Sequence, residues 1–138
     1  MRTLHLSLRV ADLDRSLAFY TTLGYEVIGS VPGTSIGHLT MLKLPDDEFV
    51  TVELVFDPAG APVQPGTGPY YFVVKVESMA ATIAQLAAAG IEAEPPSSPD
   101  GADDLVTTFV TDPDGNRIEL VRWPAGHPDG ITAADRQD

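Results

Sequence analysis

The sequence nearly repeats itself at an offset of 66 positions, and this repeat constrains the fold more than any other feature. The segment Glu53-Leu54-Val55 recurs as Glu119-Leu120-Val121, and the same shift relates His5 to Tyr71. A supersecondary unit that occurs twice can close a sheet or a cavity that neither copy closes alone. Polar residues repeated on the inner face should then meet their counterparts. The same gapless shift also superimposes Val10 on Val76, Gly24 on Gly90 and Leu39 on Leu105.

Composition limits the class of protein. With 138 residues, 43% of them hydrophobic, the chain can form one globular domain of two halves. It has no cysteine, which excludes disulfides, thiolate metal sites and a cysteine nucleophile. The net charge is −12 and the basic residues are scattered, so neither nucleic acid nor an anionic membrane is an expected partner. No apolar stretch approaches the roughly 18 residues of a membrane span, so a soluble, cytoplasmic protein is expected.

Each half predicts a strand, a helix and three further strands. In the first half, residues 3–10 alternate between apolar and polar side chains, with His5 and Arg9 on the polar face. The caps Asp12 and Ser78 each open a predicted helix, and Gly24 and Gly90 end them. The helix stripes are Leu13, Leu17 and Tyr20 in the first half and Met79, Ile83 and Leu86 in the second. The remaining predicted strands are 25–31, 38–44 and 49–56, then 70–77, 91–94, 104–111 and 117–123.

The module boundaries follow from these elements. The first module is predicted over residues 1–57, a proline-containing linker over 58–69, and the second module over 70–123. Residues 112–115, with the sequence Asp-Pro-Asp-Gly, predict a tight turn before the last strand. The tail, 124–138, lacks apolar periodicity and is expected to be partly disordered.

The repeat also aligns the residues best suited to bind a metal. His5 and Glu53 lie on the first and last strands of module one, and Tyr71 and Glu119 lie at the same places in module two. If each module curves into half a barrel, a twofold relation brings these four side chains to one concave centre. Imidazole and carboxylates in a sheltered cavity suit a divalent cation. A single histidine or glutamate on a strand is more often a surface or core residue, but its recurrence at one offset favours a site.

Three segments carry a resemblance to a known family. They are residues 5–14 (HLSLRVADLD) with Phe19-Tyr20 and Leu23-Gly24-Tyr25, then 52–54 (VEL), and 112–120 (DPDGNRIEL). Over residues 3–123 the chain resembles the vicinal oxygen chelate superfamily of glyoxalases, bleomycin-resistance proteins and extradiol dioxygenases, and is most similar to glyoxalase I-like single-domain members. The resemblance implies an α+β fold of two tandem βαβββ modules that form a half-open barrel and pair in a homodimer.

The resemblance also implies a set of metal ligands. These are His5, Glu53 and Glu119, with a second histidine at the position that Tyr71 occupies here. A phenol with a pKa near 10 is a poor zinc ligand at neutral pH unless the metal stabilises the phenolate. The three remaining ligands predict a divalent cation such as Mn²⁺, Fe²⁺, Ni²⁺ or Zn²⁺, with water in the open positions.

The predicted substrate is a small oxygenated metabolite. Arg9 matches a family arginine that contacts the γ-glutamyl end of glutathione, which predicts an anchor for a substrate carboxylate. Asp57 replaces the usual asparagine there, and Lys75 is the one basic residue between positions 66 and 105, so a glutathione hemithioacetal is disfavoured. Extradiol cleavage is disfavoured too, because its iron site needs two histidines and only His5 lies in register.

The sequence is consistent with two functions. The first is a metal-assisted isomerase or lyase in which Glu119 or Glu53 removes a proton next to a carbonyl while Arg9 and Tyr71 bind the substrate. The second is a metal-free protein that sequesters a small molecule, like the bleomycin-resistance branch, with Tyr71 and the carboxylates as cavity wall. Buried paired carboxylates are costly without a cation or a shared proton, which favours the enzyme.

Two further histidines could reach the cavity. His38 opens a predicted strand and is expected at an edge or rim, or at the cavity mouth. His127 lies in a turn-rich segment after the strand that carries Glu119. It predicts either a solvated tail or a lid that supplies a replacement base or ligand.

Overall fold

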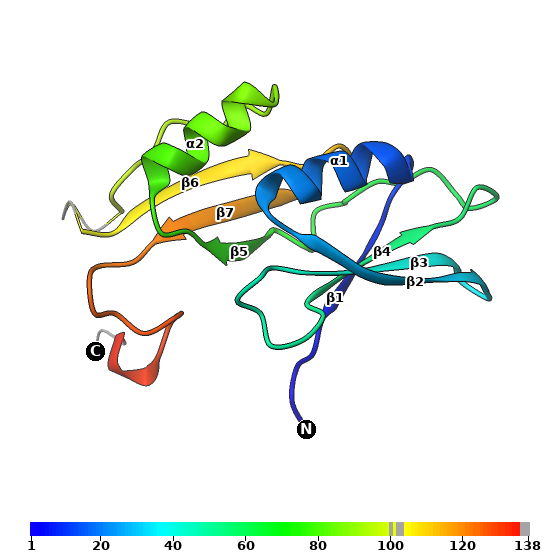
Figure 1. The fold of residues 1–138 in the computed structure, drawn as a ribbon, viewed down its shortest axis with the longest axis horizontal. Helices are drawn as coiled ribbons and strands as arrows, with labels where there is room; N and C mark the ends of the chain where they lie inside the picture. The colour runs from blue at the N-terminus through cyan, green and yellow to red at the C-terminus, as the bar shows by residue number, and fades with distance from the viewer. Residues whose placement is uncertain (100, 102–103, 136–138) are drawn as a thin grey trace. The chain divides into compact units, whose positions relative to one another are not determined.

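The computed structural model describes residues 1–99, 101 and 104–135, and the chain falls into two compact units. Unit 1 comprises Met1–Pro69 with Asp112–Gly115, and unit 2 comprises Tyr70–Thr111 with Asn116–Asp138. Each unit contains a helix and a sheet, so the fold is α+β as predicted (Figure 1). Within the described ranges, no helix has the length and apolarity that crossing a membrane requires.

Unit 1 follows the predicted order of one strand, one helix and three strands. Its four-stranded sheet has the order β1-β4-β3-β2, with β1 parallel to β4 and the other neighbours antiparallel. The elements are β1 (Leu6–Arg9), α1 (Leu13–Leu23), β2 (Glu26–Thr34), β3 (Gly37–Lys43) and β4 (Val52–Phe56).

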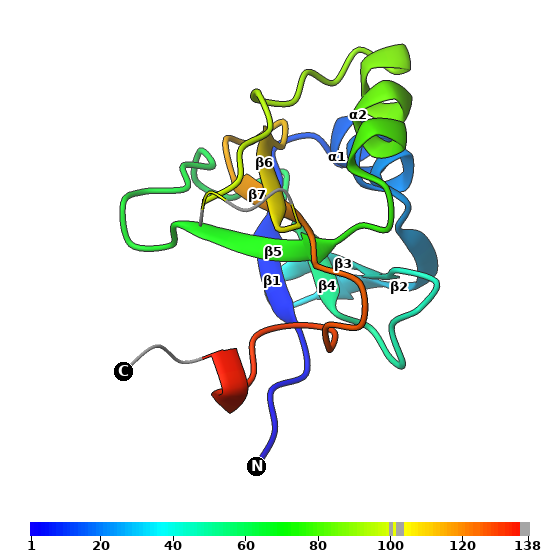
Figure 2. The same cartoon turned by 90° about the vertical axis from the view of Figure 1, so that its left-hand side faces the viewer.

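Unit 2 has a three-stranded sheet in the order β5-β7-β6, with β5 parallel to β7. Its elements are β5 (Tyr71–Lys75), α2 (Met79–Ala88), β6 (Val106–Thr111), β7 (Arg117–Arg122) and a short 3₁₀ helix, η1 (Ala133–Asp135). Helix α2 lies over one face of this sheet (Figure 1). After β7 the chain loops to η1, the red turn in Figure 2.

The strand predicted over residues 91–94 does not form. Glu94 N donates to Phe109 O at 2.9 Å, and Ser97 forms an isolated bridge with Thr107. Prolines 95 and 96 stand between these two contacts, and proline has no N–H to donate to a ladder. The segment therefore runs beside β6 with isolated hydrogen bonds instead of a fourth strand. Residues 100, 102 and 103, which follow this segment, lie outside the described part.

The 66-residue repeat is exact in the parallel strand pairs. Leu6 lies opposite Val52 in unit 1, and Phe72 lies opposite Ile118 in unit 2. Each partner in the second pair is 66 positions after its counterpart. The repeat in the sequence therefore corresponds to the same strand register in the pairs β1/β4 and β5/β7.

The helix ends repeat at the same offset. Asp12 caps α1 by accepting from the Arg15 backbone N–H at 3.0 Å, and Ser78 caps α2 by accepting from that of Ala81 at 3.2 Å. After the helices, Gly24 and Gly90 take positive φ values of 117° and 80°, which glycine adopts most easily.

The repeat shifts by two residues in one strand. Val55 pairs with Leu39 in unit 1, whereas its counterpart Val121 pairs with Thr107 in unit 2. The gapless superposition of Leu39 on Leu105 is therefore wrong. A shift of two residues keeps each side chain on its original face of the sheet, so the inward and outward pattern survives.

Most buried residues come from the strands β3, β4, β5, β6 and β7 and from one stripe of each helix. In α1 the buried residues are Ser16, Phe19 and Tyr20, while the predicted Leu13 and Leu17 are half-buried. In α2 they are Met79 and Leu86. The fully buried strand residues include Leu42, Val52 and Leu54 in unit 1, and Val110, Ile118 and Leu120 in unit 2.

Candidate functional site

Glu53 is held in place by neighbours on β1. Its register partner is Ser7, whose Oγ donates to Glu53 Oε1 at 2.6 Å. His5 precedes β1 and brings its Nε2 to 3.7 Å from Glu53 Oε2, a distance too long for a hydrogen bond. The His5 side chain is 36% exposed and that of Glu53 13%, so both are reachable from solvent. The structure thus brings together the two predicted ligands of unit 1.

This pair fits part of a metal site. A cation about 2.0–2.2 Å from an imidazole nitrogen and a carboxylate oxygen can lie between atoms separated by 3.7 Å. The pair supplies two donors. Across residues 1–99, 101 and 104–135, no group of three or more histidine, aspartate or glutamate side chains is arranged to hold a metal ion.

Glu119 has a different environment in unit 2. It lies on β7 between Val73 of β5 and Phe109 of β6, and it is partly buried. Its carboxylate has no hydrogen-bond or ion-pair partner among the described residues. Burial raises the pKa of Glu119 above the usual glutamate value. A carboxyl group of this kind is suited to exchanging a proton with a ligand.

Tyr71 lies on the same face of the sheet as Glu119. Along β5, Tyr71 and Val73 are exposed and alternate with the less exposed Phe72 and Val74. Val73 is the register partner of Glu119, which places Tyr71 two residues away on the same face. His5 has the same relation to Glu53, because Ser7 is the register partner of Glu53.

Arg9 is bound to the linker. Its Nη2 donates to the carbonyl oxygen of Ala61 at 2.8 Å. A Cβ added to Gly60 would lie 2.6 Å from that nitrogen, so glycine makes the contact possible. A substrate carboxylate would have to use the other N–H groups of the guanidinium, and this role stays a prediction.

The two other histidines take different places. His38 lies near the start of β3, opposite Phe56. The ring of His127 stacks on Trp123 at 4.3 Å, and its Nε2 lies 2.7 Å from Asp135 Oδ1. Its Nδ1 lies 2.6 Å from the carbonyl oxygen of Pro128, so both ring nitrogens are engaged within the tail. In this arrangement His127 has no nitrogen left to replace the missing metal ligand, and its side chain is only 15% exposed.

A network of hydrogen bonds around Asp112 and Asp114 was not predicted from the sequence. The Tyr20 hydroxyl donates to Asp112 Oδ2 at 2.7 Å, and both residues are buried. Asp114 Oδ1 accepts from the Ala11 backbone N–H at 3.0 Å, close to the start of α1. The turn at residues 112–115 therefore contacts the segment before α1 through Asp114 and the second half of α1 through Asp112. Turn propensity predicts the reversal of the chain, but it carries no signal for the partner of a buried aspartate.

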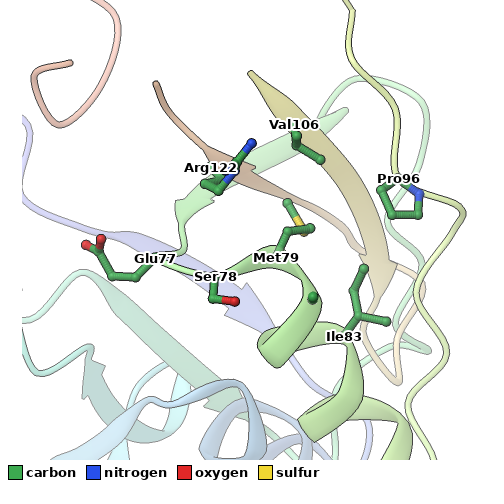
Figure 3. A pocket seen from close by; sticks show the side chains of 8 residues that line it. Glu77, Ser78, Met79, Ile83, Pro96, Val106 and Arg122 are labelled. Carbon is green, nitrogen blue, oxygen red and sulfur yellow. The ribbon is translucent and has the colours of Figure 1, made fainter. Parts of the chain in front are cut away.

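Unit 2 also contains a cavity of about 400 Å³ beside α2. Its wall is mostly apolar, with the guanidinium of Arg122 at one side (Figure 3). Arg122 stands three residues after Glu119 on β7, so it points to the opposite face of the sheet. The cavity is thus separate from the face that carries Glu119.

Comparison with known proteins places the chain in a family. The family model described as "Glyoxalase/Bleomycin resistance protein/Dioxygenase superfamily" matches residues 2–120. The chain belongs to this superfamily. The resemblance inferred from the sequence motifs is thereby confirmed.

Relatives within the superfamily carry one recurring name. A "Probable lactoylglutathione lyase" of Vibrio cholerae is 31% identical over 131 residues, which cover 91% of this chain and 94% of the relative. A "Probable lactoylglutathione lyase, chloroplastic" of Arabidopsis thaliana is 29% identical over 92% of this chain. The chain spans only 37% of that plant protein.

Solved structures share the fold of this chain. Glyoxalase I of Leishmania major matches 88% of this chain and 86% of its own, with a TM-score of 0.69 and 28% identity. An antibiotic binding protein from Streptomyces covers 91% of this chain and 98% of its own, with a TM-score of 0.68 at 21% identity. The second likeness concerns the fold alone.

Proposed function

We propose that the protein is a metal-assisted isomerase or lyase of the glyoxalase type that acts on a small oxygenated metabolite. The observation that carries this proposal is the contrast between its two repeated glutamates. Glu53 accepts a hydrogen bond from Ser7 and stands beside His5, whereas Glu119 has apolar strand neighbours and a raised pKa. Equivalent carboxylates in unlike environments are suited to different roles.

The contrast suggests how the roles divide. His5, Glu53 and Glu119 are the residues that would hold a divalent cation, whose chemistry would be to polarise the vicinal oxygens of the substrate. The hydrogen bond from Ser7 fixes the orientation of the Glu53 carboxylate. Glu119 takes the proton from the carbon next to the carbonyl, and in an isomerisation it returns that proton to the neighbouring carbon.

The relatives support lyase chemistry, while the charges argue for a substrate other than a glutathione conjugate. Lys75 is the one basic residue between positions 66 and 105, and its Nζ lies 2.6 Å from Asp129 Oδ1 and 3.2 Å from Glu77 Oε1. A second glutathione carboxylate would have to compete with both of these carboxylates. We therefore propose a smaller substrate with fewer charges.

A metal-free binding protein is the second candidate. Tyr71 favours it, because a phenol replaces the histidine that the family pattern has at this position. In that case His5, Glu53 and Glu119 would line a ligand cavity without performing chemistry.

Hydrogen–deuterium exchange at carbon tests the first candidate. Hydroxyacetone in D₂O should lose its α-protons faster with the protein and Mn²⁺, Fe²⁺, Ni²⁺ or Zn²⁺ than with the metal alone, as followed by NMR. Glu119→Gln should abolish the acceleration. Glu92→Gln is the matched control, since Glu92 is an exposed glutamate of the same unit. If none of the four metals supports exchange by the unmutated protein, the binding function replaces the enzyme.

A further inference from the structure

The sheet face of unit 2 that carries Glu119 is aromatic. Phe109 lies directly opposite Glu119 on β6, and Tyr71 stands on the same face of β5. The two rings meet edge to face, with centroids 5.2 Å apart and planes at 80°. In unit 1 the residues that flank Glu53 are Ser7 and Met41 instead. The aromatic surface is thus a property of unit 2.

The two rings differ in how accessible they are. The guanidinium of Arg117 lies 4.0 Å from the centroid of Phe109, and Glu94 holds that guanidinium at 2.7 Å. One face of Phe109 is therefore covered, and its ring is fixed. Tyr71 is 45% exposed, so a ligand ring can pack against it. Aromatic pairs of this geometry add attraction beyond the apolar area that they bury.

The charges of this face argue against an anionic ligand. Lys75 is engaged by Asp129 and Glu77, and Arg117 by Glu94. The chain as a whole carries a net charge of −12, which repels anions further. Val73 is 51% exposed between Tyr71 and Lys75, which extends the apolar surface.

We propose that the ligand is a neutral compound in which a planar aromatic ring is attached to one of the two adjacent carbons that bear the vicinal oxygens. The ring would pack on Tyr71, and the oxygens would lie toward Glu119. Phe109 would act as a positioning residue that fixes the Tyr71 ring. This inference rests on the proposed function for the role of the oxygens, and it adds the class of group that they carry.

Three α-hydroxyketones that differ only in the attached group provide the test. They are hydroxyacetone with a methyl group, 1-cyclohexyl-2-hydroxyethanone with a saturated ring, and 2-hydroxyacetophenone with an aromatic ring. Their dissociation constants are measured by ligand-observed NMR on the full chain, in EDTA and then with Mn²⁺. The aromatic compound should bind about three- to tenfold more tightly than the cyclohexyl compound, since that is the typical benefit of an aromatic pair.

Variants locate the contact. Tyr71→Phe should keep the preference for the aromatic compound over the cyclohexyl compound, and Tyr71→Leu should lose it. Phe49→Leu is the control, because Phe49 is an exposed aromatic residue of unit 1. Tyr71 is half-exposed, so neither substitution should unfold the chain.

The outcomes separate this inference from the proposed function. An aromatic preference in EDTA that depends on Tyr71 supports the inference even if no metal binds. Equal affinity for the three compounds, no binding at millimolar concentration, or a preference that survives Tyr71→Leu overturns it, even if metal-dependent exchange occurs. If Tyr71→Leu instead changes only the oligomeric state, the face is a subunit interface and the inference is also overturned.

Discussion

Glu53 and Glu119 have nearly the same apolar residues before and after them, yet their carboxylates meet different side chains. The difference comes from the neighbouring strands, which place Ser7 beside Glu53 and Val73 and Phe109 beside Glu119. The Ser7 hydroxyl group orients the carboxylate of Glu53, while burial raises the pKa of Glu119. The proposed division between a fixed ligand and a proton acceptor follows from these cross-strand neighbours.

Tyr71 allows a direct test of the missing ligand. Tyr71→His should raise the affinity for Zn²⁺ or Ni²⁺ at least tenfold, about 1.4 kcal/mol, because neutral imidazole suits these ions better than a protonated phenol. Titration calorimetry of both proteins in one buffer measures the change. Equal affinities would show that position 71 does not reach the metal.

Tyr20 should matter for stability. Tyr20→Phe removes the 2.7 Å hydrogen bond to the buried Asp112, which should lower the free energy of unfolding by about 1–3 kcal/mol. Urea denaturation measures the loss. Tyr25→Phe is the matched control, because Tyr25 is buried but its hydroxyl makes no hydrogen bond among the described residues, and it should change stability by less than about 0.5 kcal/mol. Equal losses for both variants would contradict the importance of the network.

At the scale of elements, the features that depend on a local sequence pattern could be predicted from the sequence. The helix caps at Asp12 and Ser78 and the repeated register of the parallel pairs follow from periodicity and from the repeat. The prediction of a strand over residues 91–94 was wrong, because the alternation of apolar and polar residues there is short and two prolines follow it. The place of Ser7 beside Glu53 could have been predicted, since Ser7 lies on the same strand face as His5 and Arg9. The place of Phe109 beside Glu119 could not have been predicted from the repeat, because β6 is shifted by two residues relative to the 66-residue offset.

The tail after β7 should respond to pH. His127 donates from Nε2 to the Asp135 carboxylate, and this contact, together with the one to the Pro128 carbonyl oxygen, raises the pKa of His127 above 6.5. The hydrogen bond from the Thr132 backbone N–H lowers the pKa of Asp135, and the contact with His127 lowers it further. The contact therefore contributes its full stability between about pH 3.8 and about pH 6.5, weakens as the pH rises through the raised pKa of His127, and is lost as the pH falls through the lowered pKa of Asp135.

NMR titration of the His127 ring protons checks this expectation. The midpoint should lie above 6.5 in the unmutated protein and return toward 6.5 in Asp135→Asn. Asp129→Asn should leave it unchanged, since Asp129 pairs with Lys75 instead. A midpoint at or below 6.5 in the unmutated protein would show that the contact with Asp135 is absent in solution.

At the scale of the whole molecule, both units expose large apolar residues on their strands. In unit 1 these include Val27, Ile28 and Val31 of β2, and in unit 2 Tyr71 and Val73 of β5. Exposed apolar groups clustered on one element are typical of surfaces that bind a partner or a ligand. Together with the family resemblance, the exposed residues of β2 favour the homodimer that the sequence predicted, whereas Tyr71 and Val73 belong to the face proposed to bind a ligand.

Sedimentation equilibrium tests the assembly. We expect a mass of twice 14.7 kDa at micromolar concentration, independent of whether a metal is added. Val31→Lys should lower the dimer fraction if β2 contributes to the interface, whereas Glu48→Lys, in an exposed loop, should not. A monomer at all accessible concentrations would contradict the dimer and require one chain to complete its own site.

Metal binding is the central claim, and titration calorimetry of the metal-free protein tests it most directly. The unmutated chain should bind at least one of Mn²⁺, Fe²⁺, Ni²⁺ and Zn²⁺ with one ion per chain. His5→Ala and Glu119→Gln should each abolish binding, and Glu92→Gln should not. Circular dichroism should show that all variants remain folded, because neither His5 nor Glu119 belongs to the buried core. If the unmutated protein binds none of the four ions, or if both site variants bind as well as it does, the metal-assisted function is contradicted and the binding function takes its place.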